Sequence, residues 1–127
     1  MSNLMRLVDY LEHIEKACVD CIADLKGITR ETFLLDSQIQ RSVTMSIIII
    51  GEASTKISQQ FPVFVQDNPQ IPWIAMRGIR NRLVHGYYEI NLNTLWNTAT
   101  TNIPEVYSLL SVLKLRAESY TQNIQNQ

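Results

Sequence analysis

Apolar residues recur between positions 4 and 25 at the spacing of an amphipathic helix. This i, i+3, i+4, i+7 rhythm predicts a first helix that buries one face. The apolar positions are Leu4, Leu7, Val8, Leu11, Ile14, Cys18, Cys21, Ile22 and Leu25. Gly27 follows the last of them and is expected to end the helix. Thr29 is then placed to cap a short helical turn that reaches Phe33.

A second, longer helix is predicted over residues 37–60. Asp36 is a suitable N-cap for it, because a short acidic side chain accepts hydrogen bonds from the first free amides. The pair Phe61-Pro62 is expected to end it, since proline disfavours helical backbone in the residue before it. We expect residues 61–71 to form a loop.

A third helix is predicted from Pro72 to about His85, because proline suits a first helical turn, where its missing N–H is not needed. Gly86 is then expected to be the residue just past the helix end. A fourth helix should begin near Leu92, behind the capping residue Asn91.

The fourth helix is expected to pause near residues 102–104, and a fifth should carry the remaining apolar positions. No strand pattern and no internal repeat precedes the polar tail at 121–127. The chain is therefore predicted to be all-α, an up-down bundle of four to five helices. We expect a single domain over residues 1–127 with an ordered core at about 4–120.

Four consecutive isoleucines, Ile47 to Ile50, stand out in the second predicted helix. At ~100° per residue they sweep about 300° of the helix surface, more than one buried face requires. One interpretation is a central helix surrounded by its own bundle. The other, slightly favoured, is a homodimer interface through this stretch.

The cysteine pair is interpreted as packing. Cys18 and Cys21 form a C-x-x-C, but no further zinc ligands and no βαβ pattern accompany it. The two thiols fall on the apolar face of the first predicted helix, where free cysteine behaves as a small hydrophobe.

The overall composition, 46% hydrophobic and 18% charged, is that of a soluble globular protein. No signal peptide or membrane-spanning stretch is visible, so a cytoplasmic location is expected. Charge is unevenly distributed along the chain. The net charge is −3 over residues 1–68 and +2 over residues 69–127, with Arg77, Arg80 and Arg82 close together. This favours one local phosphate contact over a long nucleic-acid surface.

Most of the residues that could bind or react with a ligand lie in one segment, residues 80–91, with the sequence Arg-Asn-Arg-Leu-Val-His-Gly-Tyr-Tyr-Glu-Ile-Asn. Guanidinium groups bind phosphate, and the imidazole of His85 can move a proton. On a helix Asn81 and His85 share a face, whereas Arg80 and His85 are offset by ~140°. Two arrangements could bring them together: the helix could unwind at His85-Gly86, or a symmetric dimer could place two copies beside a shared cleft.

Either arrangement suits RNA cleavage without a metal. His85 would take the proton of a 2′-hydroxyl, that oxygen would attack the adjacent phosphate, and Arg80 would stabilise the added negative charge. No cofactor or metal cluster is expected. The plainer alternative is that Arg80 and Arg82 are solvated helix residues, His85 is a cation favoured by the helix C-terminus, and the tyrosines only pack.

The string Arg80-Asn81-x-Leu83-Val84-His85-x-Tyr87 resembles the R-x4-H-x-Y signature of the HEPN superfamily, specifically its HepT-like toxins. The similarity extends over roughly residues 4–115. Four further segments resemble the same family in the same order: Ile49-Ile50-Gly51-Glu52-Ala53, Ile71-Pro72-Trp73, Ile79-Arg80-Asn81 and Leu95-Trp96.

The resemblance implies a dimeric helical bundle that acts as a metal-independent ribonuclease toxin, in a type II/VII-like toxin–antitoxin pair. Arg80 and His85 would be the catalytic pair, with Asn81, Arg77 and Arg82 supporting or binding substrate. The substrate would be transfer RNA or messenger RNA.

The resemblance also implies a partner, a nucleotidyltransferase antitoxin of the MNT type. It would silence the toxin by transferring AMP to Tyr87, since the added bulk and negative charge would exclude a substrate phosphate. Tyr88 falls outside the pattern. The competing hypothesis is a non-catalytic helical adaptor that binds such an enzyme.

The chain departs from the pattern of many relatives in the second helix. Met45 and Ile48 stand near positions where relatives often carry an arginine and an acid. Asn91 stands where an aspartate is common, a change that a helix cap tolerates.

Overall fold

The computed structural model describes residues 6–86 and 89–125. These residues form helices and connections, and no strand occurs among them, which confirms the predicted all-α class. The elements in order are α1 (Leu7–Asp24), α2 (Arg30–Leu35), α3 (Ser37–Gln60), α4 (Pro62–Asp67), α5 (Trp73–Gly86), α6 (Leu92–Asn97), the π-helical turn η2 (Thr98–Asn102) and α7 (Ile103–Gln125).

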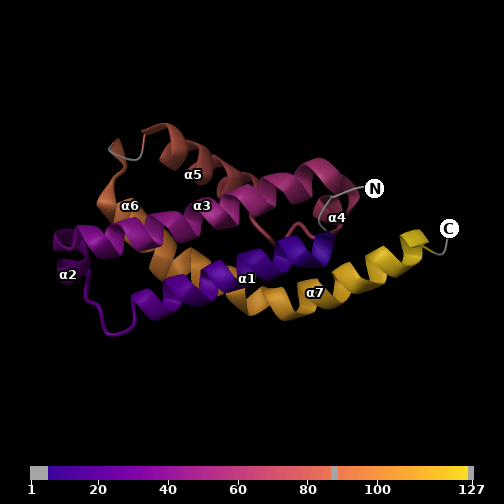
Figure 1. Ribbon diagram of the computed structural model, residues 1–127, viewed down its shortest axis with the longest axis horizontal. Coiled ribbons are helices and arrows are strands. Elements are labelled where there is room, and N and C mark those ends of the chain that lie inside the picture. The colour runs from indigo at the N-terminus through magenta and orange to yellow at the C-terminus, as the bar shows by residue number, and fades with distance from the viewer. Residues whose placement is uncertain (1–5, 87–88, 126–127) are drawn as a thin grey trace.

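The central element is α3, which lies between α1 and α5, while α7 packs on the far side of α1 (Figure 1). α1 and α3 run antiparallel: Gln60 bonds to the hydroxyl of Tyr10 at one end, and Ser42 bonds to Asp24 at the other. The core between the helices is apolar. It includes the fully buried Leu11, Ile14, Phe33, Val43, Ile57, Leu83, Leu95, Leu110 and Leu113.

The predicted helix starts are confirmed by their caps. The Thr29 hydroxyl accepts a hydrogen bond from the amide of Thr32, and the Asp36 carboxylate accepts one from Ile39. Gly27 adopts φ +75°, a left-handed conformation that favours glycine, just beyond the end of α1. Side-chain chemistry near each junction therefore sets where α1 ends and where α2 and α3 begin.

The predicted loop over residues 61–71 is wrong in its first half, because α4 occupies Pro62–Asp67. Pro62 stands in the first turn, where proline starts a helix as readily as it ends the one before. Phe64 is buried against the rings of Trp73 and Tyr120. The carboxamide of Asn68 donates to the carbonyl of Phe64 at the helix end. Tertiary packing therefore stabilises a turn too short to be recognised from its spacing.

The predicted pause in the fourth helix is confirmed as the π-turn η2, which joins α6 to α7. The amide of Ile103 bonds to the carbonyl of Thr98, five residues earlier. Pro104 has no N–H to donate to the carbonyl of Thr100, so the regular α-helical ladder cannot pass through this turn. Asn91 caps the start of this bent helix through the amides of Asn93 and Thr94.

The interpretation of the cysteines as packing residues is confirmed. Cys18 and Cys21 are free thiols with no exposed surface. Burial raises the pKa of both thiols from 9.0 to about 12, so they stay protonated and weakly reactive at neutral pH.

Within the described ranges, no helix is long and apolar enough to cross a membrane.

Candidate functional site

The site is built where α5 packs against α3 through Gly51. A Cβ placed on Gly51 would meet the side chain of Arg80 and lie 2.7 Å from the carbonyl oxygen of Met76. Glycine therefore allows the two helix backbones to approach closely at this level. The aliphatic stem of Arg80 occupies the space above Gly51, which directs its guanidinium along the outer edge of the α3–α5 contact.

The guanidinium of Arg80 is held by two neighbours. Its Nη2 lies 2.6 Å from Oε2 of Glu52 on α3, and its Nη1 donates to Oδ1 of Asn81 at 3.0 Å. The Nε is buried and has no hydrogen-bond partner. The remaining Nη hydrogens are the donors left for a ligand, and the Arg80 side chain is about one quarter exposed (26%).

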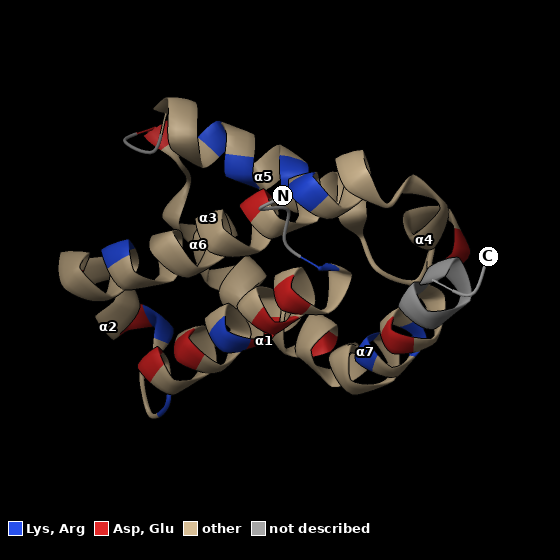
Figure 2. Cartoon of the chain, turned by 45° about the vertical axis from the view of Figure 1, so that its right-hand side comes forward, with Lys and Arg blue, Asp and Glu red and all other residues tan. Residues whose placement is uncertain are grey.

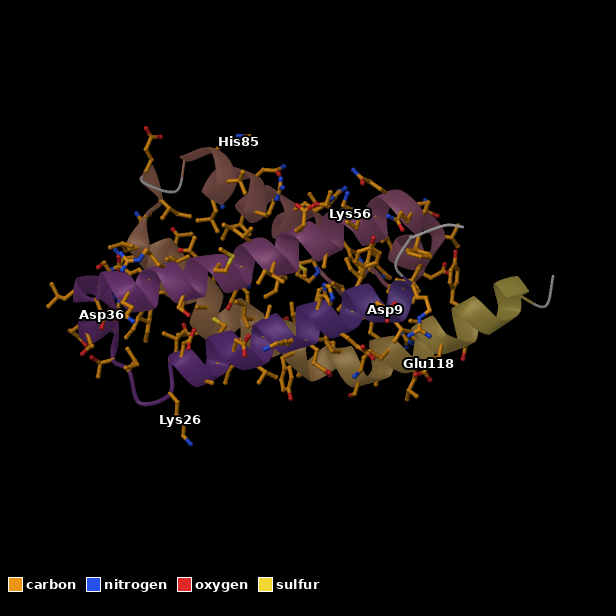
Figure 3. The ribbon with its side chains drawn as sticks, in the orientation of Figure 1. Asp9, Lys26, Asp36, Lys56, His85 and Glu118 are labelled. Carbon is orange, nitrogen blue, oxygen red and sulfur yellow. The ribbon has the colours of Figure 1, made fainter. Side chains whose placement is uncertain are left out.

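His85 lies on the exposed side of the C-terminal end of α5, pointing away from the bundle (Figure 3). It lines a shallow depression with Arg82, Glu89, Asn91 and other residues of the turn into α6. Arg80 does not line this depression. One subunit therefore does not bring Arg80 and His85 into a common hollow.

α5 remains helical through Gly86, which corrects two expectations. Gly86 is the last helical residue, with no left-handed φ, and not the residue past the end. The backbone is also not unwound at His85-Gly86, so that route for swinging the imidazole toward Arg80 is not used.

The three arginines of α5 follow one another along the helix (Figure 2), but their side chains have different surroundings. Arg77 is half-buried one turn before Arg80, and its Nε lacks a hydrogen-bond partner. Arg82 is exposed on the opposite edge, beside η2 and α7. The predicted supporting residues are therefore not a single cluster: Asn81 contacts Arg80, and Arg82 accompanies His85.

The four isoleucines of α3 divide between two environments. Ile47 and Ile50 are buried in the bundle core, as the central-helix interpretation requires. Ile48 is half-buried and Ile49 is 39% exposed, one turn from Met45, which is 57% exposed. An apolar strip of Met45, Ile48 and Ile49 therefore lies on the outer face of α3, next to Glu52. We call it the α3 strip.

The tyrosine predicted to be modified, Tyr87, and its neighbour Tyr88 lie outside the described residues. Across residues 6–86 and 89–125, no group of three or more His, Cys, Asp or Glu side chains is placed to hold a metal ion.

Glu52 is the site residue that reasoning from the sequence does not find. The sequence places it in the family-like segment Ile49–Ala53 but gives no sign that it pairs with Arg80. The available signal is its place beside Gly51, since a glycine within a long helix marks a close approach of another element. The spacing within α3 does not say which helix approaches there.

Comparison of the sequence with known proteins identifies a family for this chain. The family model described as "Ribonuclease HepT-like" matches residues 7–113. The chain is 35% identical over 97 residues to "Putative RNase TTE0752" of Caldanaerobacter subterraneus, covering 76% of this chain and 84% of that protein. It is 36% identical over 99 residues to "Probable ribonuclease HepT" of Thermococcus cleftensis, covering 77% and 86%.

A third relative is "Putative RNase MJ0127" of Methanocaldococcus jannaschii, 32% identical over 98 residues, which cover 77% of this chain and 75% of that protein. No solved structure gives a significant match. The matched range includes the whole of α3 and α5, with Glu52, Arg80, Asn81 and His85. This chain, an all-α bundle with Glu52 on α3 and Arg80, Asn81 and His85 on α5, belongs to the HepT-like ribonuclease family.

Proposed function

We propose that this protein is a metal-independent endoribonuclease toxin that cleaves RNA with Arg80 and His85. The observation that carries the proposal is the pair of polar groups displayed by α5 in a chain of a ribonuclease family: a guanidinium fixed by Glu52 and Asn81, and an exposed imidazole. Fixing a guanidinium before substrate arrives favours transition-state binding, because no reorganisation is needed at the moment of reaction.

The roles follow from the two groups. His85, whose side chain is exposed, acts as a general base and removes the proton of a 2′-hydroxyl. The resulting oxygen attacks the neighbouring phosphorus, and the bond from that phosphorus to the 5′-oxygen of the next nucleotide breaks. The 5′-oxygen leaves with a proton from the imidazolium of His85 or from water, so the products are a 2′,3′-cyclic phosphate and a 5′-hydroxyl end. Arg80 donates its free Nη hydrogens to the phosphate oxygens as their charge increases.

The active unit is proposed to be a homodimer. Since Arg80 and His85 face different sides of α5, a second subunit is needed to complete one cleft. The α3 strip offers the surface for it, and Val84 of α5 adds apolar area at 44% exposure. The contacts of Gly51 with Arg80 and of Ser54 with Met76 set an antiparallel register that brings Ile48 level with Leu83 and Val84.

Control is proposed to come from a nucleotidyltransferase antitoxin of the MNT type, which transfers AMP from ATP to the hydroxyl of Tyr87 and releases pyrophosphate. Tyr87 is two positions from His85 in sequence. A phosphodiester and an adenosine at that position would repel the substrate phosphate and fill the approach to the imidazole.

One observation favours the second hypothesis, a non-catalytic adaptor. Arg80 is already paired with Glu52, and in one subunit it does not share a depression with His85. A chain that never dimerises would present these groups separately and would serve as a binding surface for the nucleotidyltransferase.

The first experiment compares growth arrest on expression of the chain alone with arrest by His85→Ala, and repeats the comparison with purified protein and RNA. His13→Ala is a matched control, because His13 is the other histidine and lies exposed on α1. We expect arrest and cleavage to disappear in His85→Ala only. Persistent toxicity of that variant, or a wild-type chain that cleaves no RNA, would favour the adaptor.

The second experiment measures intact mass after incubation with the nucleotidyltransferase and ATP. We expect a gain of one AMP in the wild type and in Tyr88→Phe, and no gain in Tyr87→Phe. If Tyr87→Phe still gains AMP, the assignment of the modified residue is wrong.

A further inference from the structure

A cavity of about 190 Å³ lies between α3, α5 and the π-turn η2, on the side of α5 away from Arg80. Its floor is apolar, with Ile47 and Ile50 from α3, Ile79 from α5 and Ile103 from α7. A floor of this kind favours a flat or apolar group that leaves water.

The rim of the cavity is polar. Arg82, Thr98 and Asn102 line it, and none of their side chains makes a hydrogen bond or ion pair with another of the described residues. A hydroxyl, a carboxamide and a guanidinium are therefore free to bind a ligand at the mouth of an apolar hollow. A few polar groups converging on an apolar pocket are the usual composition of a small-molecule site.

The π-turn η2 supplies two of the three polar residues of the rim. Pro104 interrupts the α-helical ladder, and the extra residue of η2 widens the helix at Thr98–Asn102. Both ends of this turn, Thr98 and Asn102, line the cavity. Single π-helical turns occur frequently at functional sites, which agrees with a binding role for this one.

Arg82 links the cavity to the predicted cleavage site. It lines this cavity and also the depression that contains His85. On a helix, residues three apart are surface neighbours, so the guanidinium of Arg82 and the imidazole of His85 lie on adjacent turns of α5. A strand whose phosphate reaches His85 would pass Arg82 on its way to the cavity.

We propose that this cavity is a nucleobase subsite of the ribonuclease. It holds the base of a nucleotide next to the scissile phosphate, with Thr98 and Asn102 bonding to the edge of the base and Arg82 binding the phosphate between. This inference rests on the proposed ribonuclease function and adds to it a determinant of where the RNA is cut.

RNA is the occupant that fits the charge and the shape together. Proteins that read RNA sequence take unstacked bases of single strands into pockets and bond to their edges. The cation at the rim is Arg82, on the helix that also carries Arg77 and Arg80 (Figure 2), and its guanidinium suits one phosphate of the strand. An acyl chain would fill the apolar floor but leave the carboxamide and hydroxyl unused.

The test is cleavage of an RNA library with randomised positions, followed by sequencing of the cut ends. Thr98→Val and Asn102→Ala remove the edge contacts, while Thr101→Val and Asn97→Ala are matched controls that do not line the cavity. The wild type and the controls should show a base preference beside the cut. The two rim variants should lose it, with kcat/KM for the preferred RNA falling about tenfold.

A second measurement keeps the outcomes separate. The binding of short RNA oligomers, one for each base, is compared between the single variant His85→Ala and the double variant His85→Ala, Asn102→Ala. Thermal melting checks that both variants are folded. The four nucleoside monophosphates are then added as competitors. If the wild type cleaves RNA and the rim variants keep its preference, the subsite is overturned and the nuclease stands. If the wild type cleaves no RNA, the nuclease proposal fails. If the single and the double variant then bind the RNA oligomers equally well, the subsite is overturned. If the monophosphates bind and the oligomers do not, the cavity is assigned to a free nucleotide.

Discussion

Arg80 of α5 and Glu52 of α3 form an ion pair across the helix contact, with Nη2 and Oε2 2.6 Å apart. The pair is partly exposed, at 26% of the arginine side chain and 44% of the glutamate side chain. An exposed ion pair of this kind stabilises a fold by only about 0.2–1 kcal/mol. Its main consequence is therefore orientation, because Glu52 fixes the guanidinium while also competing with a phosphate for it.

Replacing Glu52 by Gln should lower both KM and kcat. Without the carboxylate, no negatively charged group competes with RNA for Arg80, so KM should fall. The guanidinium also loses its fixed position, so kcat should fall about tenfold. Steady-state kinetics on a defined RNA measure both constants. Glu12→Gln, an exposed acid on α1, is the matched control. Unchanged kcat in Glu52→Gln would show that the ion pair does not position Arg80.

Gly51→Ala should destabilise the protein by about 1–3 kcal/mol, because its Cβ would overlap the stem of Arg80 and press on the carbonyl of Met76. Gly78→Ala is the internal contrast. Gly78 lies on α5 with nothing within 4 Å of the place that an added Cβ would take, so alanine there should stabilise by up to about 1 kcal/mol. Urea unfolding measures both. Equal effects at the two glycines would contradict the close α3–α5 contact.

Ile49→Asp should convert the proposed homodimer to a monomer without unfolding it, because the charge falls on the α3 strip and not in the core. Leu35→Asp is the control, since Leu35 is 90% exposed at the end of α2, away from the strip. Light scattering at micromolar concentration gives the molar mass. A wild-type chain that is monomeric under those conditions would rule out the dimer.

Mixing two inactive variants should restore RNA cleavage if the cleft is shared between subunits. A dimer of one Arg80→Ala chain and one His85→Ala chain keeps Arg80 in one subunit and His85 in the other. These two residues form one complete site only if the cleft is composite. Cleavage is measured after co-refolding the two purified chains. Activity that stays absent in the mixture, although both variants dimerise, would place the whole site within one subunit.

The stability of the fold should fall as the pH rises above about 9. Burial raises the pKa of Cys18 and Cys21 to about 12 in the folded chain, against 9.0 when exposed. Below pH 9 both states keep the thiol protons, so nothing is lost. Between pH 9 and 12 the unfolded thiols ionise while the folded ones do not, which favours unfolding.

The measurement is the free energy of unfolding against pH for the wild type and for the double variant Cys18→Ala, Cys21→Ala. The double variant is expected to have a lower absolute stability, because a cavity replaces each thiol, but a flatter alkaline slope. Identical slopes would mean that other groups account for the alkaline loss.

The helix boundaries show how much local sequence can decide. Thr29, Asp36 and Asn91 cap the helices predicted from them, and Gly27 ends α1, because a cap needs only a side chain and an amide a few residues away. Pro104 likewise signals the interruption at η2 from its own missing N–H. The short helix α4 escapes prediction, because the burial of Phe64 against Trp73 and Tyr120 depends on residues distant in sequence.

The residues of the site also differ in how far the sequence could predict them. The residues of the motif could be picked out from their types and spacing, and the helix period alone separated Arg80 from His85 by ~140°. The ion-pair partner of Arg80 could not be predicted from the sequence, because an ion pair between α3 and α5 depends on how the two helices pack. Nor could the spacing of the isoleucines say that Ile47 and Ile50 are buried while Ile49 is exposed.

The all-α class, most helix ends and the reactive residue types of α5 could be predicted from the sequence, since these follow from periodicity, caps and residue types over a few positions. The packing of the helices was needed to show that Glu52 pairs with Arg80, that Arg82 lines both the cavity and the depression at His85, and which face of α3 is exposed. Those depend on the register and the angle at which helices pack, which are set by many side chains at once.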